Sequence, residues 1–163
     1  NAINATTRAL LLWYRWAPYL GVMGRSVAEF LDESGSAGMS NAARWAKLSL
    51  DEQMVAKALL ESGRKLEILA PSSTQKTADF IVDGVSTELK TLTSEVFNEN
   101  TAVTKIVEAF DQGKAVILNA RQYDLSIDQM KSLIERVVGS LNSKGKELSG
   151  TIEIWTQSGQ YKF

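Results

Sequence analysis

Two acids and a lysine stand close together between residues 77 and 91: Asp79, Glu88 and Lys90. The Asp-Gly pair at 83–84 that separates the acids is the strongest short signal for a two-residue hairpin turn. Counting outward from that turn places Asp79 opposite Glu88, and opposed residues on antiparallel strands share one face. Lys90 falls on the same face, diagonal to Asp79.

Two opposed carboxylates repel each other, and a divalent cation is the natural compensation. Carboxylate oxygens are ligands for Mg²⁺ or Mn²⁺, with Zn²⁺ as a third candidate. Lys90 then lies where it can orient a water or stabilise charge on a phosphate. The pattern predicts metal-assisted hydrolysis of a phosphodiester, with Asp79 and Glu88 as metal ligands. The spacing alone also fits a solvated ion-pair cluster on an exposed hairpin.

The composition excludes several classes of catalytic and binding site. The 163 residues include no cysteine and no histidine, which excludes a disulfide scaffold, a thiol nucleophile and a Ser-His-Asp triad. The formal net charge is −1, so the chain has no basic field over its whole surface. Any nucleic acid would therefore bind at a restricted docking patch. Nothing in the sequence indicates a small-molecule cofactor.

The elements that must position the hairpin follow from residue 49 onward. A capping-box pattern at 49–52 starts a helix, and Gly63 ends it. Apolar periodicity then predicts strands, helices and a final hairpin in the order α-β-β-β-α-β-α-β-β. The expected ranges are 51–62, 65–70, 78–82, 85–91, 101–112, 115–119, 127–142, 151–155 and 160–163. This order predicts an α/β (α+β) fold with a mixed central β-sheet flanked by helices.

The first 48 residues show a different pattern, which predicts helices alone. We expect helices over 5–16, 22–33 and 41–47, with a Gly/Ser-rich connector at 34–40. The chain is accordingly divided into an N-terminal helical segment, 1–48, and a second domain, 49–163. The segment carries the positive excess and is expected to help dock a polyanion. The arginines expected to do so are Arg8, Arg15, Arg25 and Arg44.

The most apolar stretch is Ala9–Met23, which Arg15 and Pro18 interrupt. It is shorter than the roughly 20 apolar residues that a membrane-spanning helix needs. We therefore expect no stable membrane insertion. Because the chain starts with Asn, we also expect it to be a piece of a larger protein.

Asp79 followed across a hairpin by Glu88-Leu89-Lys90 resembles the PD-(D/E)xK nuclease motif, although Ala78 stands where that motif has Pro. The wider stretch 72–84, together with 105–119, is similar to the C-terminal nuclease domains of contact-dependent growth inhibition toxins, the CdiA class. The resemblance covers about residues 49–145.

The resemblance implies a PD-(D/E)xK-like nuclease fold over 49–163. It implies that Asp79 and Glu88 bind metal and that Lys90 assists the attacking water. It also implies a further catalytic acid from the first helix of this domain, for which Glu52 is the best match. Glu52 is equally well explained as the acid of the capping box.

Side chains around the motif could contact phosphate oxygens of a substrate. They are Lys76, Thr77, Thr87, Thr91 and, by resemblance, Gln112. Threonine is also common on strands because of its β-propensity alone.

The resemblance implies a toxin nuclease that a large cell-surface protein exports and delivers into the cytoplasm of a target bacterium. It implies a nucleic-acid substrate, with tRNA favoured over DNA, and a cognate immunity protein as partner. Two alternatives stay open: a DNA nuclease, either toxin or restriction-type, and a non-catalytic binding module with an inert hairpin.

Overall fold

One seven-stranded sheet organises the chain, in the order β1-β7-β6-β5-β4-β3-β2. The computed structural model describes residues 14–16, 24–34, 39–70 and 78–163. The parallel centre is formed by β4, β5 and β6, and the other pairs are antiparallel. The strands are β1 (Tyr14–Trp16), β2 (Leu66–Ile68), β3 (Phe80–Val82), β4 (Val85–Thr91), β5 (Ala115–Asn119), β6 (Ile152–Thr156) and β7 (Gly159–Lys162).

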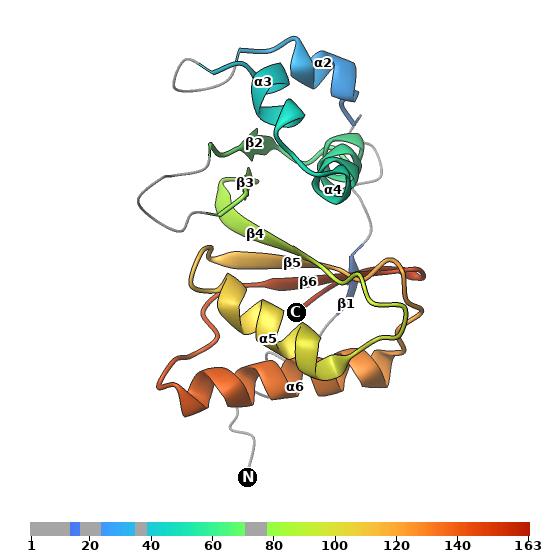
Figure 1. Cartoon of the computed structure of the whole chain (residues 1–163), viewed down its shortest axis with the longest axis vertical. Helices are drawn as coiled ribbons and strands as arrows, with labels where there is room; N and C mark the ends of the chain where they lie inside the picture. Colours follow the sequence, from blue (N-terminus) through green and yellow to red (C-terminus); the bar gives the residue numbers. More distant parts are fainter. Residues whose placement is uncertain (1–13, 17–23, 35–38, 71–77) are drawn as a thin grey trace.

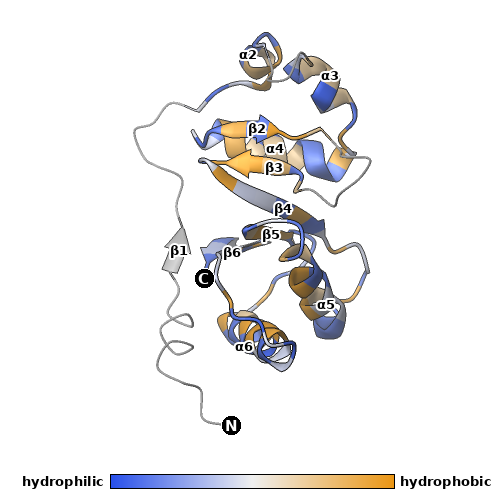
Figure 2. Ribbon diagram, turned by 90° about the vertical axis from the view of Figure 1, so that its left-hand side faces the viewer, coloured by the Kyte–Doolittle hydropathy of each residue, from blue (hydrophilic) through white to orange (hydrophobic). Residues whose placement is uncertain are grey.

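Helices cover both faces of this sheet (Figure 1). They are α2 (Val27–Leu31), α3 (Asn41–Ala46), α4 (Leu50–Glu61), α5 (Glu99–Ala109) and α6 (Ile127–Ser143). One apolar core joins α5 and α6 to β5 and β6, and a second joins α4 and the N-terminal helices to the opposite face. Figure 2 shows α4 beside β2 and β3, and α5 and α6 below β5 and β6, with orange apolar residues in the strands and on the helices. The predicted mixed sheet with flanking helices, in the predicted order after Ser49, is confirmed.

The hairpin that carries the acids forms as the Asp-Gly pair predicts. Both turn residues have positive φ, 50° for Asp83 and 82° for Gly84, as a two-residue hairpin turn requires. Register follows from the turn, so Val82 pairs with Val85 and Phe80 with Thr87.

An ion-pair network centred on the buried Arg64 fixes this turn to the rest of the sheet. Asp83 accepts hydrogen bonds from the Lys65 backbone at 2.9 Å and from the Arg64 side chain at 3.0 Å. The guanidinium of Arg64 also donates two hydrogen bonds, at 2.8 and 3.0 Å, to buried Glu153 on β6. The turn is thus held at the hairpin end opposite the two catalytic candidates.

The N-terminal region differs from expectation. The helix predicted over 5–16 is wrong for its last three residues, because Tyr14–Trp16 pair with β7 as an edge strand. Aromatic residues favour strands, and β7 offers an open edge. The rest of that prediction lies outside the described residues. Of the helix predicted over 22–33, the described residues 24–33 form only α2, because the Ser26 side chain caps its start.

Helices α2 and α3 pack against α4 and β2. Phe30 is only 1% exposed, and its carbonyl accepts a hydrogen bond from Asn41 at 2.9 Å. Arg44 is buried and donates to the Ile68 carbonyl at 2.7 Å. The predicted docking role of Arg44 is therefore wrong, because its guanidinium joins α3 to β2. Arg25 forms an ion pair with Glu33. No helix in the described part of the chain is long and apolar enough to cross a membrane.

Candidate active site

The carboxylate of Asp79 lies where β3 separates from β4. Asp79 is the residue before β3, and its Oδ2 accepts a hydrogen bond from the Leu89 backbone at 3.1 Å. The side chain thus takes the place of a strand carbonyl beside β4. Extending the register by one residue beyond Phe80 and Thr87 sets Asp79 opposite Glu88. The hairpin brings the two acids together as the turn predicts.

Glu88 is a buried acid, only 4% exposed. Burial, followed by the nearby charge of Asp79, raises the pKa of Glu88 to about 8. Burial is also the main cause that raises the pKa of Asp79, although the hydrogen bond from Leu89 opposes it. The interaction between the two carboxyl groups raises the pKa of Glu88 and lowers that of Asp79, which favours the proton on Glu88. Without a cation, the pair therefore keeps one proton at neutral pH.

Lys90 completes the cluster from the same face of β4. Its Nζ lies 3.6 Å from Glu88 Oε1, and its charge lowers the pKa of both acids. Within the described residues, the other oxygen, Glu88 Oε2, is buried without a hydrogen-bond partner. A buried carboxylate oxygen of this kind is satisfied by a cation, a water or a ligand donor.

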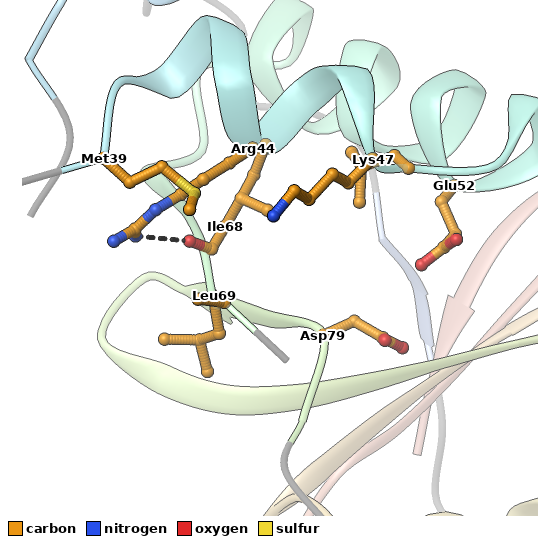
Figure 3. A pocket seen from close by; sticks show the side chains of 9 residues that line it. Met39, Arg44, Lys47, Glu52, Ile68, Leu69 and Asp79 are labelled. Carbon is orange, nitrogen blue, oxygen red and sulfur yellow. Dashed lines mark hydrogen bonds between the residues drawn. The ribbon is translucent and has the colours of Figure 1, made fainter. Parts of the chain in front are cut away.

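A cavity of about 180 Å³ opens beside Asp79, between the α3–α4 connection and the end of β2. Figure 3 shows Lys47, Glu52 and Asp79 lining it. Glu52 is the acid of the capping box and also lies near Asp79; its catalytic role stays a prediction. Its Oε1 accepts from the Ser49 backbone at 2.9 Å in a capping box, and its charge contributes to raising the pKa of Asp79.

Lys47 was not among the residues that the sequence singled out. It is the exposed C-cap residue of α3, and it brings a positive charge to the cavity wall. Its position five residues before Glu52, just ahead of the capping box, is the signal that could have identified it.

The donor set fits a hard divalent cation. Asp79 and Glu88 supply carboxylate oxygens, one of them unsatisfied, and the raised pKa of each acid reflects burial and like charge that a cation would offset. No cluster of three or more acidic side chains arranged to hold a metal occurs among the residues that the structure describes. Glu52 is thus placed as a neighbour of the pair, and water would complete the coordination.

The structure places the expected substrate-binding residues in different environments. Lys76 and Thr77 lie outside the described residues. The prediction for Thr87 is wrong: this residue is 3% exposed, and its hydroxyl donates to the Val85 carbonyl at 2.9 Å, so a phosphate cannot reach it. Thr91 is half-buried and pairs with Asn119 at the end of β4. Gln112 lies in the turn before β5, next to Gly113, which adjoins the β4 backbone at Ser86 and Glu88.

The family model described as the contact-dependent growth inhibition CdiA C-terminal domain matches residues 76–160. No curated protein matches the chain. One similar solved structure is the CdiA-CT/CdiI toxin and immunity complex from Burkholderia pseudomallei. It is 15% identical with a TM-score of 0.49, and the match covers 86% of this chain and 96% of that chain.

Proposed function

The chain belongs to the contact-dependent growth inhibition CdiA C-terminal domain family, and from this premise we propose that it is a toxin that cuts phosphodiester bonds of nucleic acid. The family model covers the whole hairpin, including both acids and Lys90. The observation that carries the proposal is the pairing of buried Glu88 with Asp79 and Lys90 at the end of β3. Neither a salt-bridge cluster nor a plain hairpin needs two acids that share a proton.

Each residue would have a distinct task. Asp79, locked by the Leu89 backbone, and Glu88, with its free oxygen, would hold a divalent cation. Bound there, such an ion supplies Lewis acidity toward a phosphoryl oxygen and a lower pKa for a bound water. Lys90 would place positive charge beside the phosphate that undergoes attack. Glu52 would orient water and adjust the charge of the cluster from the cavity wall.

Delivery and neutralisation follow from the family. CdiA C-terminal domains are the toxic part of a cell-surface protein that acts in contact-dependent growth inhibition. We propose delivery to the cytoplasm of a target bacterium, where tRNA is the favoured substrate. A producing cell would need a cognate immunity protein that blocks this site.

Incubation of the purified chain with total tRNA and with plasmid DNA tests the proposal. Each substrate is incubated with Mg²⁺, with Mn²⁺ and with EDTA. We expect cleavage of tRNA that needs a cation and stops in EDTA. Cleavage of plasmid but not of tRNA would identify DNA as the substrate. Intact tRNA and intact plasmid under every condition would overturn the nuclease function.

A further inference from the structure

Arg121 is the first residue after β5 and Ala120, at the edge of the sheet where the parallel strands end. Its guanidinium lies over the ring of Trp155, 4.8 Å from the centroid. Trp155 is fully buried on β6, so this ring is a rigid support. Stacking on an aromatic face covers one side of the guanidinium and leaves its N–H edge available for planar recognition.

The loop that carries Arg121 is anchored on both sides. Ala120 donates to the Trp155 carbonyl at 2.8 Å, and the Arg121 backbone donates to the Asn119 side chain at 3.4 Å. Beyond it, Gln122 donates to the Ser94 carbonyl at 2.8 Å, and the Gln157 backbone donates to the Tyr123 carbonyl at 3.0 Å. An arginine held this firmly loses little further conformational entropy when it binds a ligand.

The charge of Arg121 lacks compensation in the described structure. No ion pair links its half-buried side chain to a carboxylate among the described residues. Burial alone lowers the pKa of Arg121, with no acid acting against this effect. The ring of Trp155 contacts this half-buried guanidinium but does not neutralise it, and an anion is the group that would. The structure therefore presents a preorganised anion contact.

The contact lies on the same edge as the carboxylate cluster. Lys90 pairs with Leu118 and Thr91 with Asn119, so Arg121 stands three residues beyond the level of Lys90 on the next strand. Arg121 follows in the turn after Ala120 and covers Trp155, which is in register with Asn119 and lies on the α4 face, whereas Lys90 shares the face of Leu118. A nucleic acid whose scissile phosphate lies at Lys90 and whose backbone crosses this end of the sheet can place another phosphate at Arg121.

From these contacts we propose that Arg121, supported by Trp155, binds a backbone phosphate of the nucleic-acid substrate outside the cleavage site. This inference rests on the proposed function for the identity of its ligand. Arg121 would then be a positioning contact that supplies positive charge at one point on the surface of a chain whose net charge is −1.

The experiment measures binding apart from cleavage. Fluorescently labelled tRNA and labelled single-stranded DNA are titrated in EDTA with the full chain carrying Lys90→Ala, over about 50–200 mM salt. Adding Arg121→Gln should weaken binding roughly tenfold, equivalent to about 1.4 kcal/mol. It should also reduce the salt slope by about one, the signature of one lost phosphate contact. Arg121→Lys should retain the slope and lose part of the affinity.

Controls separate this contact from general charge and from folding. Lys131→Ala removes an exposed charge on α6 and should leave binding unchanged. Thermal unfolding reports whether Arg121→Gln is still folded, and Arg121→Lys serves if the glutamine variant unfolds. Equal binding by the parent and the folded Arg121→Gln variant would overturn the inference, as would an equal loss in Lys131→Ala or no binding by the parent.

The two proposals fail in different ways. A wild-type chain that cuts tRNA while Arg121→Gln binds and cuts equally well would contradict the phosphate contact alone. A wild-type chain that cuts nothing, although binding depends on Arg121, would contradict the nuclease function alone.

Discussion

Asp79 has two roles that different substitutions separate: it holds the Leu89 backbone and it supplies negative charge. Asp79→Asn keeps an oxygen acceptor for Leu89 and removes the charge. We expect cleavage to fall by at least about 100-fold, while thermal stability stays near that of the wild type. Asp79→Ala should lose cleavage equally and also about 1 kcal/mol of stability, because the Leu89 N–H loses its partner.

Thermal melts and initial rates of tRNA cleavage check both variants. An Asp79→Asn protein that is folded and cuts at the wild-type rate would remove Asp79 from the active site.

Glu88 makes the stability of the cation-free protein depend on pH. Its pKa is about 8 in the folded chain, against 4.5 as the ordinary value, so between these values the folded state binds more protons than the unfolded state. The contribution of this group is therefore fully present below about pH 4.5 and is lost as the pH rises through about 8. We expect the melting temperature in EDTA to decrease across that window.

Glu88→Gln is the matched variant, since it cannot ionise. Its melting temperature should depend less on pH and should exceed that of the wild type at pH about 8 by a few degrees, which corresponds to about 1 kcal/mol. Parallel pH profiles for the two proteins would contradict the raised pKa of Glu88. Cation affinity of the wild type should increase over the same window, because binding displaces the proton.

At the scale of single residues, the sequence predicts the cluster well because one turn determines it. The Asp-Gly pair sets the register, and the register sets Asp79 beside Glu88. The burial of Thr87 could not be predicted in this way, because its exposure depends on the second core packed against β4. The sequence alone leaves Arg121 either a phosphate-binding residue or an ordinary loop arginine, because its contact with Trp155, 34 residues later, is visible only in the structure.

Among the elements, α4 carries the residue whose two interpretations are hardest to separate. Gln at the third position of a capping box preserves the reciprocal hydrogen bond, as Gln129 does at the start of α6. Glu52→Gln should therefore leave stability within about 0.5 kcal/mol of the wild type. If Glu52 also acts in the cavity, cleavage should fall by roughly tenfold or more.

Ser49→Ala is the complementary variant. It removes the other half of the cap and should cost about 1 kcal/mol with little change in the cleavage rate of the folded protein. Full activity in Glu52→Gln would assign this acid to capping alone.

The elements after Ser49 were predictable because their apolar periods and caps agree with their final environment. The predicted capping box at Ser49 forms, and the structure adds a second one at Ser126. The N-terminal strand was not predictable, since the open edge of β7 selects its conformation. A locally helical pattern of aromatic residues gives no information about that edge.

For the molecule as a whole, the first helices complete the second core. Phe30 is buried against α4, and Arg44 and Asn41 connect the same layer to β2 and α2. Removal of residues 1–48 would expose this apolar face of α4. We therefore expect the fragment 49–163 to lose its cooperative thermal transition or to aggregate.

Phe30→Ala in the full chain is a milder test of the same packing. It should cost about 3–5 kcal/mol, while Glu29→Ala on the exposed side of α2 should cost little. A fragment 49–163 that melts like the full chain would instead support an independent domain after residue 48. The division of the chain at that boundary stays a prediction.

The central claim is that Asp79, Glu88 and Lys90 form a nuclease active site, and Lys90 tests it most directly because it holds no backbone group in place. The measurement is the initial rate of tRNA cleavage with Mg²⁺ by the wild type, by Lys90→Ala and by Lys131→Ala, each checked for its melting temperature. We predict that Lys90→Ala stays folded and loses at least about 100-fold in rate, whereas Lys131→Ala cuts like the wild type. Equal rates for all three folded proteins would contradict the account.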